Sequence, residues 1–211
     1  MKVAILTSSS QWFEQYAQIL ATKIEATLYF SHKNIENFDI VFILSYHKII
    51  PKEILKLNRH NIVIHASALP KGKGWSPMFW QILEDKNSIP FSMFEASDGV
   101  DNGDIYMQKT LKLTGYELNK ELREKQAVFT IEMCQEFLKN YDKYKYSKPQ
   151  QGDESIYPKR TSKDSILDTD KTINEQFNLL RIVDNNEYPA FFYKDNRKYI
   201  LKIEEAKDEN R

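Results

Sequence analysis

The sequence predicts an α/β protein with an open, mostly parallel sheet and a small α+β subdomain near its carboxyl end. Three observations support this. Short apolar runs alternate with segments of helical spacing over the first 65 residues. The runs are continuously apolar, which is typical of strands buried on both faces of a parallel sheet. After residue 138 the composition turns polar, which separates a compact final segment from the rest.

The first half of the chain is expected to form four strands and two helices. Ser8, Ser9 and Ser10 stand where they can cap the first helix, and Pro51 suits the first turn of the second. The expected strands are 3–7, 26–30, 38–44 and 62–64, and the expected helices are 12–23 and 51–57.

Further along, the Pro- and Gly-rich residues 66–77 are expected to be an irregular loop. A helix at 78–83, strands at 90–95 and 105–113, and a helix at 118–138 follow. The last helix is expected to bury its apolar side chains, namely Leu118, Leu122, Val128, Ile131, Cys134 and Leu138. We therefore expect a catalytic domain at 1–140, a linker at 141–156 and a small subdomain at 157–205. That subdomain should hold a helix at 173–181 and a hairpin of strands 190–193 and 198–203.

The charge and cysteine content narrow the function. The chain has 211 residues, 30 basic and 30 acidic side chains and one Cys. Its zero net charge gives no global field for nucleic acid or an anionic membrane. One Cys excludes an intrachain disulfide framework and a Cys-rich metal site. No apolar run reaches the roughly 20 residues of a membrane span, and the N-terminal run is too short for a signal peptide. We expect a cytoplasmic protein without nucleic-acid or membrane partners.

Two side chains are the first candidates for chemistry. His65 ends an apolar strand, and open α/β sheets bind ligands beyond the carboxyl ends of their strands. Asp101 lies in a glycine-flanked turn. A His beside a carboxylate performs general acid–base catalysis near neutral pH. The alternatives stay open at this point: a structural His at a strand end and an ordinary turn Asp.

The motifs around these residues resemble a known family. His65–Pro70 followed by Gly72–Pro77 resembles the H-x-S-x-L-P…[RK]-G-x-x-P loop of the formyltransferases, and Asp101–Ile105 resembles their D-x-G-x-I motif. Residues 38–51 resemble the strand and loop that cradle the folate pterin. The resemblance implies a Rossmann-like fold and transfer of a formyl group from 10-formyltetrahydrofolate to an amine, without a metal. It also implies contacts to the folate from Tyr46, Ile49, Ile50, Ser97 and Gly99.

The family's catalytic set is Asn, His and Asp, which the resemblance carries over to His65 and Asp101. The Asn normally lies two residues before the His, where this chain has Val63. Asn61 faces the same side but lies two residues further back, about 7 Å from Val63. We therefore expect a protonated His65 to stabilise the developing oxyanion largely alone, with backbone or water donors, while Asp101 supports it and relays a proton.

Three amine acceptors are compatible with this family. Methionyl-tRNA enzymes carry a sizeable C-terminal β-barrel, whereas only about 55 residues follow the expected linker here. Glycinamide ribonucleotide enzymes have a glycine-rich loop where this chain reads Thr7-Ser8-Ser9-Ser10-Gln11. The loop Lys71–Leu83 and the C-terminal segments beginning at Tyr157 and Phe177 resemble sugar-nucleotide N-formyltransferases. The preferred acceptor is UDP-4-amino-4,6-dideoxy-L-AltNAc of a pseudaminic acid pathway. A dTDP-4-amino sugar, or a non-catalytic folate- or nucleotide-binding role, is the alternative.

This resemblance suggests contacts to the nucleotide-linked amino sugar. The expected residues are Ser9, Ser67, Lys73, Trp75, Tyr157, Arg160, Asn178 and Arg181. The basic residues offer fixed positive charge for a pyrophosphate, and the aromatic residues offer a surface for stacking. Surface cations, packing anchors and a local polar network of Asn178 with Arg181 are the competing interpretations. A homodimer through the C-terminal region is a further expectation.

Overall fold

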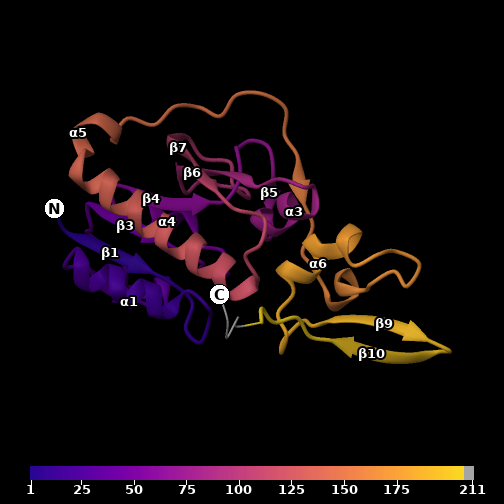
Figure 1. Cartoon of the computed structure of the whole chain (residues 1–211). Coiled ribbons are helices and arrows are strands. Elements are labelled where there is room, and N and C mark those ends of the chain that lie inside the picture. Colours follow the sequence, from indigo (N-terminus) through magenta and orange to yellow (C-terminus); the bar gives the residue numbers. More distant parts are fainter. Residues whose placement is uncertain (207–211) are drawn as a thin grey trace.

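The computed structural model describes residues 1–206 and confirms the α/β class. Its central sheet has six strands in the order β2-β1-β3-β4-β6-β7 (Figure 1). Strands β1, β2, β3 and β4 pair in parallel, whereas β6 and β7 add an antiparallel edge. The strands are β1 (Val3–Leu6), β2 (Thr27–Tyr29), β3 (Ile40–Ile43), β4 (Asn61–His65), β6 (Ser88–Glu95) and β7 (Ile105–Lys112).

Helices cover the sheet unequally. On one face, α1 (Glu14–Lys23), α3 (Pro77–Leu83) and α4 (Asn119–Lys139) share the main apolar core with the strands. On the other face, the short α2 (Lys52–Leu55) contributes Leu55 to a smaller apolar cluster with β1 and β3. This second face is covered mainly by loops, which leaves room there for a site. No helix within residues 1–206 is long and apolar enough to cross a membrane.

Two expectations about helices are wrong in detail. The serines do not cap α1: Phe13 occupies the N-cap, and the Ser10 backbone N–H donates to the Glu14 carboxylate over 2.6 Å. Ser10 itself has a left-handed backbone, so an extra turn precedes the helix. In α4, Leu138 is partly buried against the main core, but Val128 is 44% exposed and Leu118 lies outside the buried face. That face consists of Leu122, Ala127, Thr130, Ile131, Met133, Cys134 and Phe137.

The loop expected at 66–77 contains one regular element. Lys73–Gly74 forms β5, which pairs in parallel with β8 (Ile156–Tyr157). The partner strand comes from a segment far along the chain, so local sequence does not reveal the pairing. Gly74 is required here, since a Cβ at this position would lie 2.4 Å from the Tyr157 carbonyl oxygen.

The carboxyl-terminal part forms the expected helix and hairpin. A turn at α5 (Tyr141–Tyr144) precedes an extended segment, and 3-10 turns at Ser162–Ser165 and Asn174–Gln176 lead into α6 (Phe177–Ile182). Strands β9 (Ala190–Lys194) and β10 (Arg197–Leu201) pair in antiparallel. Asp195 and Asn196 both have positive φ, as a two-residue type I′ turn requires. In Figure 1 the hairpin extends from the body of the protein.

Candidate active site

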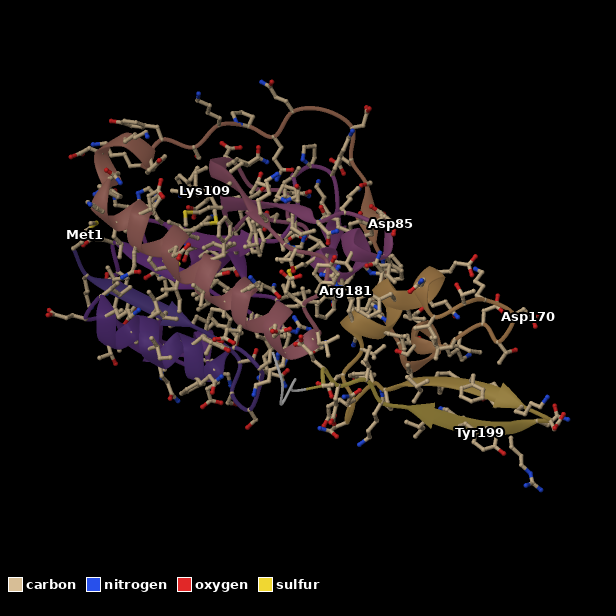
Figure 2. All side chains as sticks on the ribbon, in the orientation of Figure 1. Met1, Asp85, Lys109, Asp170, Arg181 and Tyr199 are labelled. Carbon is tan, nitrogen blue, oxygen red and sulfur yellow. The ribbon has the colours of Figure 1, made fainter. Side chains whose placement is uncertain are left out.

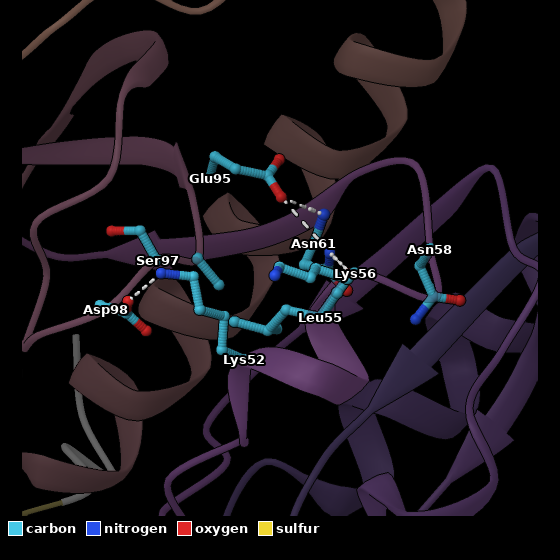
Figure 3. A pocket seen from close by; sticks show the side chains of 9 residues that line it. Lys52, Leu55, Lys56, Asn58, Asn61, Glu95, Ser97 and Asp98 are labelled. Carbon is cyan, nitrogen blue, oxygen red and sulfur yellow. Dashed lines mark hydrogen bonds and ion pairs between the residues drawn. The ribbon is translucent and has the colours of Figure 1, made fainter.

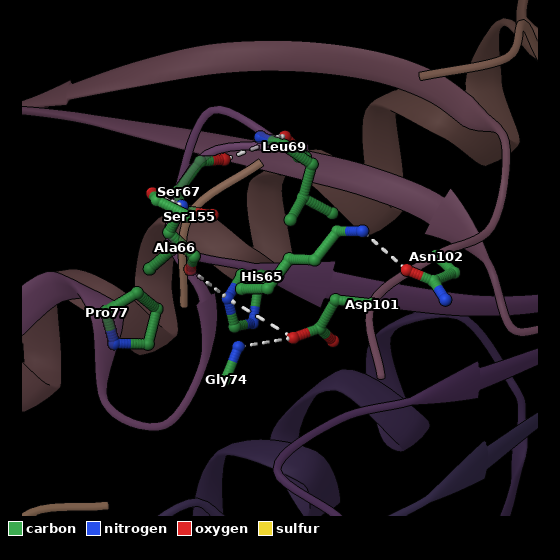
Figure 4. A network of polar contacts seen from close by, with 12 residues as sticks. His65, Ala66, Ser67, Leu69, Gly74, Pro77, Asp101, Asn102 and Ser155 are labelled. Carbon is green, nitrogen blue, oxygen red and sulfur yellow. Dashed lines mark hydrogen bonds and ion pairs between the residues drawn. The ribbon is translucent and has the colours of Figure 1, made fainter. Parts of the chain in front are cut away.

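His65 is the last residue of β4. Asn61, Val63 and His65 point to the same face of the sheet because side chains alternate along a strand. The His65 side chain is only 11% exposed. Its Nε2 lies 2.9 Å from the carbonyl oxygen of Gly72, so a protonated Nε2 donates to that oxygen. The loop that follows β4 therefore folds back over its own histidine (Figure 4).

Asp101 reaches the same place from the loop between β6 and β7. Its Oδ2 lies 3.6 Å from His65 Nε2 and accepts a hydrogen bond of 2.9 Å from the Gly74 backbone N–H. Asp101 adopts a left-handed backbone with φ 53°. A Cβ at Gly103 would lie 1.6 Å from the Glu95 carbonyl oxygen, so only glycine fits there. The D-x-G spacing thus permits the turn that brings this carboxylate to the histidine.

Lys73 and Ser67 lie in the wall of this site. Lys73 is 3% exposed, and its ammonium group contacts Asn102 Oδ1 and, at 3.0 Å, Glu154 Oε1. The Lys73 charge is therefore already compensated. Ser67 is buried and its hydroxyl has no hydrogen-bond partner among the described residues. Of the two, Ser67 has hydrogen-bonding capacity left for a ligand.

No polar side chain of β4 replaces the asparagine that the family has two residues before its histidine. Val63 packs in the apolar cluster of the loop-covered face. Asn61 is buried near the start of the strand, where its amide donates 2.9 Å to the Leu55 carbonyl and 3.4 Å to Glu95 Oε1. Asn61 is therefore committed to other partners, which agrees with the expectation that it does not replace the missing donor.

A cavity of about 400 Å³ opens on the same face, between α2 and the loop that carries Asp101 (Figure 3). Leu55 and Ala96 give it apolar surface. Asn61 and Glu95 supply polar groups, and Ser97 is also among the lining residues. An ion pair between Lys52 and Asp98 links the two sides of the cavity.

The remaining expected folate contacts lie on two loops. Tyr46 shares a hydrogen bond of 2.8 Å between its hydroxyl and His32 Nδ1. Ile50 packs in the cluster that includes Val63, whereas Ile49 is 91% exposed. Gly99 has φ 93°, a conformation that glycine adopts readily. The exposed Ile49 beside the half-buried Ile50 is available to cover a flat apolar ligand.

The serine segment after β1 contributes a residue that sequence reasoning missed. Ser9 is exposed, whereas Ser8 is 2% exposed and its Oγ lies 2.6 Å from His47 Nδ1. The same oxygen accepts from the His47 backbone N–H over 3.2 Å. Ser8 thus ties the loop after β1 to the loop carrying Tyr46, Ile49 and Ile50. The position of Ser8 at the carboxyl end of β1 is the sequence feature that could have identified it as part of the site.

Tyr157 and Arg160 gather around Trp80 on α3. The Tyr157 ring stacks on Trp80 at 6.1 Å, and its hydroxyl donates to the Glu84 carboxylate. Burial, together with Glu84, raises the pKa of Tyr157. Arg160 lies over the same indole at 6.0 Å, and burial lowers its pKa; its Nε has no partner among the described residues. Trp75 stands nearby and is 51% exposed.

The substrate-binding expectation for Arg181 is wrong. The residue is 1% exposed, and its guanidinium donates to the Glu117 carbonyl, the Glu117 carboxylate and Asn87 Oδ1. Arg181 therefore joins α6 to the body of the protein (Figure 2). Asn178 donates 2.7 Å to Asp85 and accepts from Arg181. These contacts support the alternative interpretation, a local polar network of Asn178 with Arg181.

Sequence reasoning also missed three residues of the expected linker. Gln150 contacts the backbone of Asp101 and Gly103, Glu154 pairs with Lys73, and the Ser155 hydroxyl accepts from the Gly72 N–H. Each of the three contacts either the loop of residues 66–77 or the loop that carries Asp101. Their polar, turn-rich context gave no local sign of these contacts. Within residues 1–206, no group of three or more His, Cys, Asp or Glu side chains is arranged to hold a metal ion.

Residues 1–135 match the family described as Formyl transferase, and the chain belongs to this family. It is 30% identical over 174 residues to the methionyl-tRNA formyltransferase of Thermodesulfovibrio yellowstonii, covering 80% of this chain but 55% of that protein. The chain thus spans about half the length of that relative.

Two solved structures illustrate the likeness in fold. Methionyl-tRNA formyltransferase from Clostridium thermocellum superposes with TM-score 0.80 at 20% identity, covering 100% of this chain and 96% of that one. A sugar N-formyltransferase from Shewanella sp FDAARGOS_354 superposes with TM-score 0.70 at 16% identity, covering 98% and 100%. At these identities the likeness concerns the fold alone.

Proposed function

We propose that this protein is an N-formyltransferase that moves a formyl group from 10-formyltetrahydrofolate to an amino group of a nucleotide-linked amino-dideoxy sugar. The observation that carries the proposal is the approach of Asp101 Oδ2 to His65 Nε2, 3.6 Å apart, in a chain of the formyl transferase family. One side chain comes from the end of β4 and the other from the loop after β6, and both are largely buried. That arrangement suits proton transfer in a site that excludes most water.

The reaction then follows from these groups. The neutral amine attacks the formyl carbon, and a new C–N bond forms while the carbonyl becomes an oxyanion. His65 stabilises that oxyanion as a hydrogen-bond donor. The bond from the formyl carbon to N10 of the folate breaks as the intermediate collapses. The proton that the amine gives up passes by way of Asp101, directly or through water, to the departing nitrogen.

The folate is expected to occupy the loop-covered face. Ile49 and Ile50 supply apolar surface for a flat ring, and the neighbouring cavity is lined by the polar side chains of Asn61, Glu95 and Ser97. A pterin has an apolar face and a polar edge, so this combination fits it. Tyr46, Ser97 and Gly99 belong to the loops that border this space.

The sugar acceptor is favoured by three features. The zero net charge provides no general attraction for tRNA. The Lys71–Leu83 loop resembles that of sugar enzymes. Tyr157, Arg160 and Trp75 place aromatic surface and a guanidinium close to the loop that contacts His65. We propose UDP-4-amino-4,6-dideoxy-L-AltNAc as the first acceptor to test and a dTDP-4-amino sugar as the second. Ser9, Ser67 and Lys73 remain proposed parts of this subsite.

Methionyl-tRNA is the competing acceptor, because the sequence relative named above is a methionyl-tRNA formyltransferase. A non-catalytic folate- or nucleotide-binding protein is the second alternative, and Val63 in place of the family asparagine is the observation behind it. We also propose a homodimer through the β9–β10 hairpin, which exposes Tyr193, Tyr199 and Ile200. Light scattering on the purified chain tests it, and a monomer at all concentrations overturns it.

An acceptor panel with 10-formyltetrahydrofolate tests the activity, read by mass spectrometry for the gain of one formyl group. The panel holds UDP- and dTDP-linked 4-amino sugars, glycinamide ribonucleotide and methionyl-tRNA. Formylation of a nucleotide sugar alone supports the proposal. Formylation of methionyl-tRNA alone contradicts the sugar proposal and makes methionyl-tRNA the acceptor. Tetrahydrofolate binding without any product favours the non-catalytic alternative.

A further inference from the structure

The segment between α4 and α6 is hydrogen-bonded to both loops of the candidate site, namely the loop of residues 66–77 and the loop that carries Asp101. The backbones of Lys148 and Ile105 exchange two hydrogen bonds, of 2.7 and 2.9 Å, next to the loop that carries Asp101. Further on, β8 pairs with β5, and Ser155 hydrogen-bonds with the backbone around Gly72. We call residues 148–157 the strap. Its two ends are held by backbone pairing, so the strap does not depend on any one side chain to stay in place.

Gln150 lies between these two attachments and faces the Asp101 loop. Its amide nitrogen donates 2.7 Å to the Asp101 carbonyl oxygen and 2.8 Å to the Gly103 carbonyl oxygen. Because both partners are acceptors, the side-chain nitrogen of Gln150, and not its oxygen, faces the Asp101 loop. One planar NH₂ group thus bridges the two carbonyls on either side of Asn102. No other side-chain hydrogen bond to these two carbonyl oxygens is found within residues 1–206.

The bridged turn contains a residue with a positive φ of 53° at Asp101, and this φ sets the direction of its side chain. Asp101 has a left-handed backbone, which a non-glycine residue adopts at a cost. This conformation directs the carboxylate to the Gly74 N–H and toward His65. A hydrogen bond to the Asp101 carbonyl acts on the peptide unit whose orientation sets the turn. Holding that unit holds the carboxylate.

We propose that Gln150 is a positioning residue that fixes Asp101 against His65. It touches neither reacting atom and acts only through the Asp101 loop. This inference rests on the proposed function for its kinetic consequence, but the placement of Asp101 beside His65 can be measured without turnover.

Gln150→Glu is the decisive change, because it keeps the size of the side chain while setting a carboxylate against two carbonyl oxygens. Gln151→Glu is the matched control, since it makes the same change at the exposed neighbouring residue. Gln150→Met removes both donors without adding charge and serves if the glutamate variant does not fold. Asp101→Asn supplies the reference for a His65 that has lost its charged partner.

The first readout is the ring-nitrogen NMR spectrum of His65, assigned by its disappearance in His65→Asn. We expect Gln150→Glu to move these resonances in the direction seen in Asp101→Asn, and Gln151→Glu to leave them unchanged. The second readout is formyl transfer. We expect kcat to fall by about tenfold to a hundredfold while KM for donor and acceptor stays within about threefold, because positioning is lost and binding is kept.

A folded Gln150→Glu or Gln150→Met protein with wild-type His65 resonances overturns the inference, and so does a wild-type kcat. If the wild-type chain transfers no formyl group to any acceptor in the panel, the proposed function fails. The His65 resonances then decide the positioning role by themselves, since movement supports it and an unchanged spectrum overturns it.

Discussion

His65 Nε2 and Asp101 Oδ2 lie 3.6 Å apart, although one residue ends β4 and the other lies in the loop after β6. The Gly74 N–H holds the same carboxylate oxygen, and the Gly72 carbonyl holds the same imidazole nitrogen. The loop of residues 66–77 therefore positions both partners at once. A change in this loop is expected to disturb the pair even where it touches neither side chain.

Replacing His65 with Asn tests the oxyanion role. We expect kcat to fall at least about a hundredfold, the usual scale for an acid–base group. The melting temperature should change little, since His65 makes one side-chain hydrogen bond within residues 1–206. Steady-state rates with the preferred acceptor, alongside thermal melting, measure both. A rate within tenfold of wild type would remove His65 from the mechanism.

Asp101→Asn separates the charge of Asp101 from its structural hydrogen bond. An Asn side-chain oxygen still accepts from the Gly74 N–H, so the loop should keep its shape. We expect a loss of about a hundredfold in rate with tetrahydrofolate binding mostly intact. Asp104→Asn, an exposed change in the same loop, is the control and should keep full activity. Equal losses in the two variants would contradict a specific role for Asp101.

Val63→Asn restores the amide that the family places two residues before its histidine. Val63 is half-buried in a small apolar cluster, so we expect the fold to survive with a loss of about 1–3 kcal/mol. An increase in kcat is the expected result, because the amide adds an oxyanion donor. Val63→Ala controls for the change in packing. A gain in both variants, or in neither, counts against Val63 as the site of a missing donor.

Arg181 supports the fold rather than the site. Replacement by Met leaves the buried Glu117 carboxylate without its guanidinium partner, and losing one member of a buried pair costs about 3–5 kcal/mol. For a chain of this size we expect the melting temperature to fall on the order of 10 °C. Calorimetry of Arg181→Met, with the exposed Lys198→Met as control, measures it. An unchanged melting temperature would show that this contact is dispensable.

The Glu117 carboxylate also makes the stability of the protein depend on pH. Burial opposes the charge of Glu117, but hydrogen bonds from the Thr114 and Gly115 backbone outweigh it and lower its pKa from 4.5. A depressed folded-state pKa stabilises the protein above the unfolded value, and this contribution is lost as pH falls below about 4.5. From pH 6 to pH 4, we expect the melting temperature of Glu117→Gln to fall by less than that of wild type. The difference between the two decreases should be on the order of a few degrees. Parallel curves would refute this account.

The sequence predicted the parts of this protein that depend on local pattern. Continuous apolar runs located the strands, and the end of one of them located His65. The expected strands 190–193 and 198–203 located the hairpin, which turns at Asp195-Asn196, two residues that tolerate positive φ. Each of these is decided by neighbouring residues.

The errors arose where a distant partner decides the outcome. Val128 fits a helical apolar stripe, but the sheet that α4 covers selects another face of the helix. Arg181 carries a charge suited to an anion, yet Glu117 binds it. Gln150 lies in a polar segment with no motif, and only the folded chain brings it to Asp101.

Transfer of an isotopically labelled formyl carbon tests the central claim most directly. Wild type and His65→Asn are incubated with labelled 10-formyltetrahydrofolate and UDP-4-amino-4,6-dideoxy-L-AltNAc, and the products are followed by NMR. We predict that the label appears as a formamide on the sugar 4-nitrogen with wild type and at least about a hundredfold more slowly with the variant. Label that stays on the folate, is released as formate, or reaches only methionyl-tRNA would contradict the account.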